Sequence, residues 1–224
     1  MENQEIAFGR HPSAQLNSLF LNKPFQGQAP ENARIVFLSS DANYSPQISE
    51  HDFFKYILEY QEDGVRFWKK YNVHHPFLLD AYPFDKTKNG RPFHNNFRKL
   101  ELDSGYAEFV SFIELLDIPT IGNKSSNRAE FFQLVSKLHL KYLDDLIQSD
   151  GCKMFLIPGG VLNDMLRLKD EYGVFQWLNI DHRARNIVSH VASNKIMKTY
   201  HFSAWQIHGQ IPEIKRLIDN WLDC

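Results

Sequence analysis

Short apolar runs alternate with longer amphipathic segments along this chain. The first run, Ala33–Leu38, is almost unbroken and rich in β-branched and aromatic residues, which is typical of a strand buried on both faces. Three later runs have a similar character. The predicted strands are therefore Arg34–Leu38, Phe77–Ala81, Lys153–Ile157 and Lys195–Tyr200.

Between these runs, apolar residues recur every three to four positions, as on the buried face of a helix. Ser49 is expected to cap one helix, and Asn127 with Glu130 three residues later resembles a capping box. The predicted helices are Ser13–Leu21, Ser49–Tyr60, Val65–Tyr71, Tyr106–Leu116, Asn127–Leu146, Val161–Leu168 and Pro212–Trp221.

Strands that alternate with helices predict an α/β protein, a three-layer α/β/α fold around a central four-stranded, mostly parallel sheet. The 224 residues fit one sizeable domain. We expect residues 1–32 to form an irregular N-terminal arm with one short helix, and residues 33–224 to form the domain itself.

Composition narrows the class of protein further. The formal net charge of −2 argues against a protein held to nucleic acid by bulk charge, although a local basic patch would be compatible with it. The two cysteines, Cys152 and Cys224, form no metal-binding or disulfide pattern. No basic-then-apolar leader opens the chain, and no apolar run is long enough to span a bilayer. We therefore expect a cytoplasmic monomer with no membrane partner, no metal and no cofactor.

Polar or small residues follow each predicted strand. Asp41, Asp80, the Gly159–Gly160 pair and His201 stand at the four ends. Because the carboxyl ends of parallel strands share one edge of the sheet, these residues are expected to converge on a ligand-binding rim. The alternative for Asp41 is a purely structural turn, a position in which Asp is common.

Two further groups of residues suggest binding. His74, His75 and His94 could suggest a metal site, but no carboxylate or cysteine completes a known spacing, and we expect loop or surface histidines. Basic residues could dock phosphates, with ordinary solvated charge as the alternative. These are Lys86, Lys88, Arg91, Arg183, Arg185, Lys195 and Lys198.

Two motifs at these strand ends resemble those of the uracil-DNA glycosylase superfamily. Ser39-Ser40-Asp41-Ala42-Asn43 follows the first strand, where the family has G-Q-D-P-Y or G-x-N-P. His201-Phe202-Ser203-Ala204-Trp205 follows the last, where the family has H-P-S-P and Leu. Between them, Leu78-Leu79-Asp80 resembles a strand ending in L-L-N, and Phe155–Gly159 resembles the strand that ends near a small residue.

The resemblance implies a DNA repair enzyme that hydrolyses the N-glycosidic bond of a modified or mismatched base. Asp41 would activate the water, and His201 would stabilise the leaving base. DNA, single- or double-stranded, would be the partner. The resemblance places substrate-binding roles at Ser40, Asn43, Phe53, Phe54, Asp80, Gly159, Ser203 and Trp205. For Phe53 and Phe54 the alternative is core packing, and for Trp205, which stands where the family has a wedge into the duplex, it is a surface position.

Asp80 departs from the family, which has an Asn at the corresponding strand end. An ionised Asp only accepts hydrogen bonds, so we hypothesise a base other than uracil, with a structural turn as the alternative. Two rival functions remain open. One is a serine esterase-like hydrolase that uses Ser39 or Ser40 with a histidine from the end of the last strand. The other is a non-catalytic protein that binds a nucleic acid or small ligand on the same fold.

Overall fold

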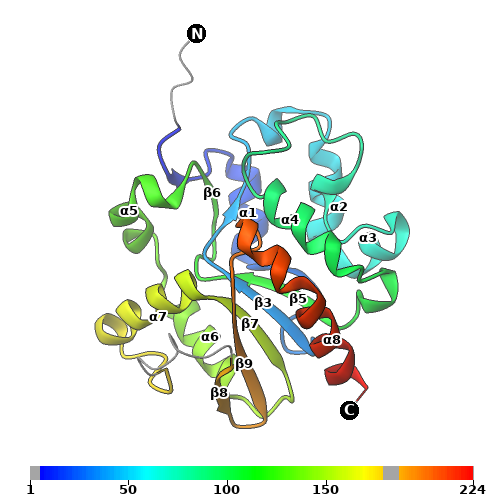
Figure 1. The fold of residues 1–224 in the computed structure, drawn as a ribbon. Helices are drawn as coiled ribbons and strands as arrows, with labels where there is room; N and C mark the ends of the chain where they lie inside the picture. The colour runs from blue at the N-terminus through cyan, green and yellow to red at the C-terminus, as the bar shows by residue number, and fades with distance from the viewer. Residues whose placement is uncertain (1–5, 179–186, 224) are drawn as a thin grey trace.

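A six-stranded sheet forms the centre of the computed structural model, which describes residues 6–178 and 187–223. The four inner strands are parallel, and each edge strand is antiparallel to its neighbour (Figure 1). In spatial order the strands are β2 (Phe25–Gly27), β5 (Val110–Glu114), β3 (Ile35–Ser39), β7 (Met154–Pro158), β9 (Asn194–Thr199) and β8 (Ile187–Val191).

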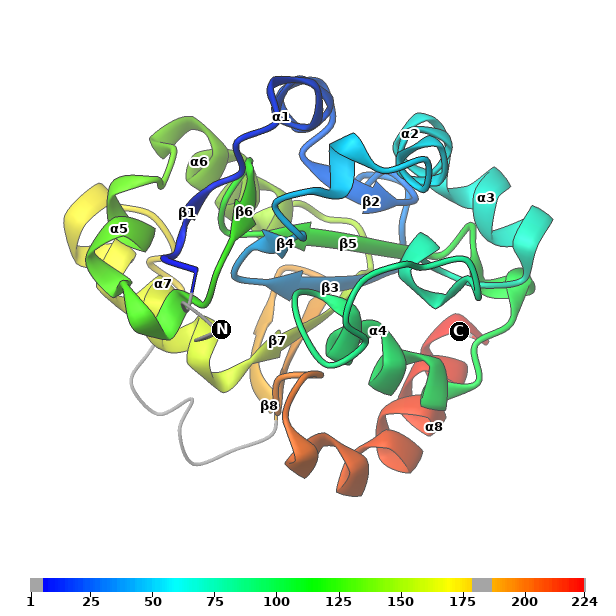
Figure 2. The same cartoon turned by 90° about the horizontal axis from the view of Figure 1, so that it is seen from above.

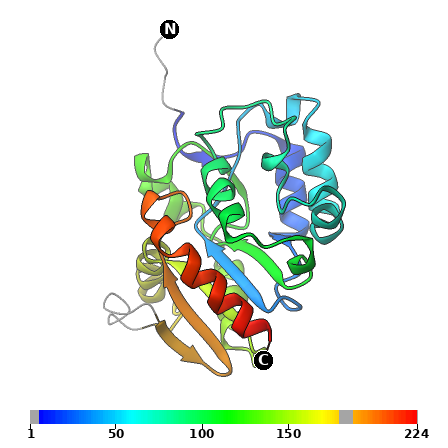
Figure 3. The same cartoon turned by 45° about the vertical axis from the view of Figure 1, so that its right-hand side comes forward.

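Helices cover both faces of this sheet, so the α/β class is confirmed. One face carries α5 (Arg128–Gln133), α6 (Lys137–Gln148) and α7 (Gly159–Tyr172). The other carries α3 (Gly64–Tyr71), α4 (Arg91–Phe97) and α8 (Ile211–Leu222), and α8 runs across the sheet in Figure 3. Strand β3 serves both cores, because Ile35 and Phe37 face α3, α4 and α8 while Val36 and Leu38 face the opposite layer.

A third core and a small second sheet lie beside the main sheet (Figure 2). Helices α1 (Ala14–Asn22) and α2 (Phe54–Glu62) supply that core. The small sheet has the order β1-β6-β4, where β1 is Gly9–Arg10, β6 is Pro119–Ile121 and β4 is Ala42–Asn43. The expected N-terminal arm thus contributes a strand to each sheet and a helix that buries Leu16 and Phe20, and of these elements only the helix was predicted. Ser13 caps that helix by accepting a hydrogen bond from the Leu16 amide.

The prediction of a four-stranded sheet is wrong in number and in one of its strands. The expected strand Phe77–Ala81 is absent, and its beginning belongs to a 3₁₀ helix, η2 (Pro76–Leu78). The missing parallel strand is β5, which falls inside the segment Tyr106–Leu116 predicted as a helix. Every residue of β5 is buried, because the strand lies between β2 and β3 with helices on both faces. Apolar residues on both faces look much the same in a buried strand and a buried helix.

The helix predictions need smaller corrections. Asn127 does cap α5, accepting from the Glu130 amide at 3.2 Å, but the expected helix Asn127–Leu146 is two helices. Ser136 begins the second one as its cap. Ser49 does not cap α2, since it lies in a separate 3₁₀ turn, Ile48–Glu50. Within residues 6–178 and 187–223, the helices are all too short or too polar to span a bilayer.

Candidate functional site

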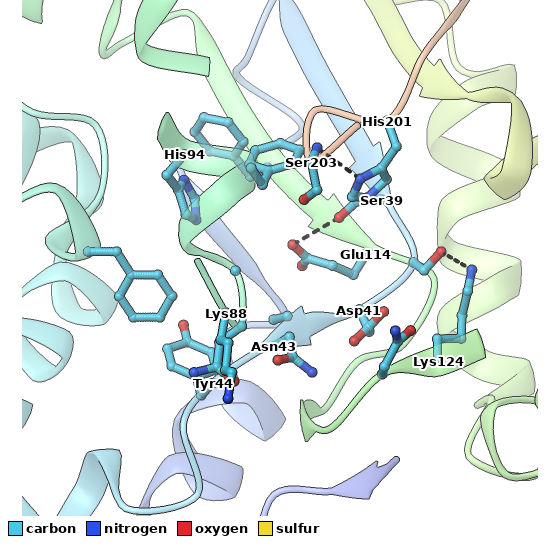
Figure 4. A pocket seen from close by; sticks show the side chains of 18 of the residues that line it. Ser39, Asp41, Asn43, Tyr44, Lys88, His94, Glu114, Lys124, His201 and Ser203 are labelled. Atoms are coloured by element: carbon cyan, nitrogen blue, oxygen red, sulfur yellow. Dashed lines mark hydrogen bonds between the residues drawn. The ribbon is translucent and has the colours of Figure 1, made fainter. Parts of the chain in front are cut away.

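A pocket of about 910 Å³ opens where the carboxyl ends of β3 and β5 meet the loop after β9 (Figure 4). Such a volume accommodates a ligand of nucleobase or nucleotide size. Its polar wall contains Gln26, Ser39, Ser40, Asp41, Asn43, Glu114, Asn123, Lys124, His201 and Ser203. Its aromatic and imidazole wall contains Tyr44, His75, Phe77, Phe93, His94 and Phe112.

Asp41 is held between the two sheets, in the short connection from β3 to β4. The Thr120 hydroxyl on β6 donates a hydrogen bond to its Oδ2 at 2.6 Å. The Asn43 amide donates to the Gly122 carbonyl at 2.7 Å and to Thr120 Oγ1 at 3.2 Å, which fixes the same corner. Burial raises the pKa of Asp41, and the Thr120 hydrogen bond and the positive charge of Lys124 partly offset this rise. A carboxylate with a raised pKa is a stronger base for removing a proton from water.

Lys124 brings a positive charge to the pocket. Its ammonium donates to Ser40 Oγ at 2.5 Å and to Asp164 Oδ2 at 2.7 Å. Asp164 is fully buried at the start of α7 and also accepts from Arg128 at 2.6 Å. Because Asp164 holds Lys124 as a cation, the lysine is not available as a base for Ser40.

His201 faces the pocket from the loop after β9, close to Ser39 in Figure 4. The Ser203 backbone N–H donates to its Nδ1 at 3.1 Å, so the neutral ring carries its proton on Nε2. Burial lowers the pKa of His201 to about 4, and the charge of Lys124 acts in the same direction. At neutral pH the ring is therefore uncharged and can donate a hydrogen bond from Nε2.

Glu114 is a second buried carboxyl group in the pocket, and the sequence analysis missed it. It ends β5, directly opposite Ser39 in the parallel pairing with β3. Ser39 Oγ donates to Glu114 Oε1 at 3.5 Å, whereas Oε2 is buried and has no partner. Burial raises the pKa of Glu114 to about 8, and the negative charge of Asp41 adds to this rise.

Aromatic rings form the rest of the pocket. Phe93 on α4 is half-buried and lies 6.0 Å from the His201 ring. Behind it, His75 and His94 stack with ring centroids 3.7 Å apart, and His74 contacts His94 at 3.1 Å. His74 and His75 lie in the loop before η2, as predicted, whereas His94 is in α4, and none of the three is at the surface because all are buried. Burial lowers the pKa of each, so they are neutral. In the described ranges, no three or more His, Cys, Asp or Glu side chains are arranged to hold a metal ion.

The structure brings half of the predicted site residues together. Five line the pocket, namely Ser40, Asp41, Asn43, His201 and Ser203. The other five lie outside its lining, namely Phe53, Phe54, Asp80, Gly159 and Trp205. The first two are buried in the third core, and Asp80 is an exposed residue after η2 because the strand expected to present it does not form. Gly159 begins α7, and Trp205 is 77% exposed on the outer surface.

Local sequence signals for the missed residues were weak but present. The run Phe109–Leu116 is rich in aromatic and β-branched residues, which favour a strand, and Glu114 lies near its end. Lys124 follows a Gly-Asn turn after β6, and nothing in its local sequence indicates a contact with Ser40, 84 positions earlier.

The basic residues considered for phosphate binding are scattered. Lys88 lines the pocket, and Lys86 is exposed in the same loop. Arg91 is buried against the Tyr82 ring, which removes it from any phosphate-binding surface. Lys195 is the second residue of β9, at the opposite end of the parallel sheet from the pocket. Arg183 and Arg185 lie outside the described residues.

The arrangement combines a buried base, a neutral imidazole donor, a protonated carboxyl group and flat apolar walls. Asp41 and His201 come from the loops after β3 and β9, whereas Glu114 belongs to β5 and the aromatic walls come mainly from α4 and η2. Comparison with models of protein families and with curated proteins gives no match to this chain.

Proposed function

We propose that this protein is a DNA glycosylase-like hydrolase that cleaves the bond between a base and deoxyribose. The observation that carries the proposal is the shared pocket of Asp41 and His201, which are 160 positions apart in the sequence and meet at one sheet edge. The motif resemblance implied this pairing. The uracil-DNA glycosylase-like fold is part of the same proposal, supported by the order of the motifs along the parallel strands.

In the proposed reaction, water attacks C1′ of the sugar as the N-glycosidic bond breaks. The water oxygen becomes the new C1′ hydroxyl, and Asp41 accepts the proton that the water loses. The bonding electron pair leaves with the base, which becomes an anion until it is protonated. His201 donates a hydrogen bond from Nε2 to this base as its charge develops. The carboxylate of Asp41 also stabilises the positive charge that develops on the sugar.

The neutral state of His201 suits this role. A protonated imidazole would already be hydrogen-bonded to solvent or to a carboxylate. A buried neutral ring donates to the developing anion without a large rearrangement of its surroundings. Phe93 and Phe77 provide flat surfaces for a base that has left the duplex. Their position in the pocket lining supports a stacking role for these two rings rather than for Phe53 or Phe54.

The serine esterase alternative has less support. Ser40 Oγ accepts a hydrogen bond from the Lys124 cation, and Ser39 Oγ donates to Glu114. Among the described hydrogen bonds, none joins either serine to His201. A nucleophilic serine of this class needs a histidine that takes its proton, and the described hydrogen bonds pair Ser39 with Glu114 and Ser40 with Lys124 instead.

Base release from labelled oligonucleotides tests the proposal, with uracil, hypoxanthine, oxidised and mismatched bases as substrates. Asp41→Asn and His201→Ala should each lower single-turnover excision by about a hundredfold or more. Matched controls are Asp145→Asn, an exposed carboxylate on α6, and His208→Ala, an exposed histidine after β9. Excision that persists at the wild-type rate in both pocket variants would rule the mechanism out. Binding of DNA without excision of any base would instead support the non-catalytic alternative.

A further inference from the structure

Glu114 is placed to contact a ligand, and the proposed reaction has not yet used it. Within β5, the side chains of Val110 and Phe112 face the layer of α3, α4 and α8. Glu114 follows Phe112 by two residues, so its side chain is on the same face of the sheet. It lies beyond the point where helices cover that face. In Figure 4 its carboxyl group points into the pocket beneath Ser39.

The surroundings of Glu114 leave one of its oxygens unsatisfied. The side chain is 6% exposed, Oε1 has only the 3.5 Å contact with Ser39, and Oε2 has no partner. A buried polar atom without a hydrogen bond costs about 1–3 kcal/mol, so such atoms are rare unless a ligand or water completes them. Glu114 itself lines the pocket, so a ligand bound there is placed to supply the missing partner.

No cation compensates a charge on Glu114 in the described structure. Lys124, which also lines the pocket, is bonded to Asp164 and Ser40 instead. Asp41, also in the pocket, carries a negative charge that disfavours a second one. The remaining titratable groups around the pocket are Lys88 on its rim, the neutral His75, His94 and His201, and the hydroxyls of Tyr44 and the nearby Tyr60.

The protonation state decides what Glu114 offers to a ligand. An ionised carboxylate only accepts hydrogen bonds, whereas a protonated one offers an O–H donor as well. Ser39 donates to Oε1, so Oε1 acts as the carbonyl oxygen and Oε2 carries the proton. Oε2 is also the atom without a partner, so the available donor points into the pocket.

We propose that Glu114 serves as an uncharged carboxylic acid that donates a hydrogen bond from Oε2 to an acceptor atom of the bound base. This inference rests on the proposed function, because that function identifies the ligand as a base. The pocket then has two neutral hydrogen-bond donors, Glu114 and His201. The hydrogen bonds from both donors become stronger as the base becomes an anion. The preferred substrates carry a carbonyl oxygen or ring nitrogen at this point, and an exocyclic amine there is disfavoured.

Loss of the proton reverses the interaction. An ionised Glu114 would present a negative charge to an acceptor atom and would repel the anionic base. Base binding and excision should therefore decline as the pH rises through about 8, where Glu114 ionises. Asp80 lies outside the pocket lining, so it does not select the base, and the preference expected from Glu114 is for a base with an acceptor atom.

The first experiment needs no activity. In protein labelled with ¹³C at glutamate side chains, the Glu114 carboxyl signal is assigned by its loss in Glu114→Gln and followed from pH 4 to 10. A midpoint near 8 is expected, and a midpoint near the ordinary glutamate value overturns the inference. Ser39→Ala should move the midpoint upward, because the Ser39 hydrogen bond favours the ionised form.

The second experiment follows ligand binding and excision against pH. Free uracil, hypoxanthine, cytosine and adenine at millimolar concentration are titrated into the protein at pH 7. At least one should shift the Glu114 signal, and no shift with any base overturns the inference. Glu114→Gln keeps a donor that does not titrate, so binding and excision should persist and lose their alkaline decline. Glu114→Ala should lower both at least tenfold at all pH values, while the exposed control Glu108→Gln behaves as wild type.

The outcomes separate the two proposals. Base binding that depends on Glu114, without excision of any base, would refute the glycosylase function and leave the inference standing. Excision at the wild-type rate in Glu114→Ala would refute the inference and leave the function standing. An alkaline decline that is unchanged in Glu114→Gln would also overturn the inference.

Discussion

Two buried carboxyl groups, Asp164 and Glu114, have completely different surroundings. Asp164 on α7 has both oxygens paired with cations, Lys124 and Arg128. Glu114 on β5 has no cation, and one of its oxygens has no hydrogen bond. Both side chains are almost inaccessible to solvent. Burial by itself therefore does not separate a structural carboxylate from a ligand-binding one, whereas the count of satisfied atoms does.

The difference assigns separate roles to the two regions. The junction of α5 and α7 is closed, since Asp164 pairs with both Lys124 and Arg128 and aromatic rings lie against the two cations. The wall formed by β5 and α4 is open to a ligand, with neutral histidines and an unpaired carboxyl oxygen. Lys124 connects the two, because it pairs with Asp164 and faces the pocket.

The largest expected effect is on stability, from removing the paired carboxylate. Asp164→Ala leaves Lys124 and Arg128 without their partner, and we expect a loss of about 3 kcal/mol in the free energy of unfolding. This loss of stability is at the lower end of the range for breaking a buried ion pair, because Arg128 is 52% exposed. Urea denaturation at pH 7.5 measures it. Asp145→Ala, which breaks an exposed pair with Lys141, should cost below about 0.5 kcal/mol. Equal losses in the two variants would remove the distinction between closed and open regions.

The buried histidines of the pocket wall should lower the free energy of unfolding in acid. The folded-state pKa of His94 is about 3, below the ordinary histidine value, so stability is fully present above pH 6.5 and falls as the pH decreases through that value. At pH 5 the loss from His94 is about 2 kcal/mol. His94→Gln should show a smaller difference in unfolding free energy between pH 7.5 and pH 5. If the difference equals that of wild type, the acid sensitivity arises elsewhere.

Lys124 should couple the two regions electrostatically. Its charge lowers the pKa of His201 and of Asp41, so Lys124→Met should raise both. Excision needs neutral His201 and ionised Asp41, and its acid limb should therefore move to higher pH by up to about one unit. The pH profile of single-turnover excision measures this, with Lys141→Met on α6 as the control. An unchanged acid limb would show that the lysine acts only within the closed region.

The smallest effect on stability is expected at the outer surface beside the pocket. Trp205 lies in the 3₁₀ helix η7 (Trp205–Gly209) and is 77% exposed, so Trp205→Ala should change the free energy of unfolding by below about 0.5 kcal/mol. If it contacts the duplex, as the family resemblance implies, DNA affinity should fall several-fold in an anisotropy titration. Leu138→Ala, at a residue 83% exposed on α6, is the matched control and should alter neither quantity.

The sequence by itself determined the class of fold and the two loops that carry the proposed chemistry. Apolar runs with β-branched residues identify β3, β7 and β9, because strands buried on both faces need such side chains. Once three strands are parallel, their carboxyl ends must share an edge, so Asp41 and His201 could be placed together. Asn127 as a helix cap could also be predicted, since capping depends on neighbours three residues apart.

Only the tertiary structure decided which remaining residues join that edge. The segment that contains Glu114 has no local feature that fixes it as a strand, and it becomes one because β2 and β3 pair with it on either side. The segment before Asp80 is equally apolar, yet it forms a 3₁₀ turn. Lys124 meets Ser40 and Asp164 through loop closure over 84 and 40 positions. Such contacts depend on the pairing of distant segments, and local periodicity does not report that pairing.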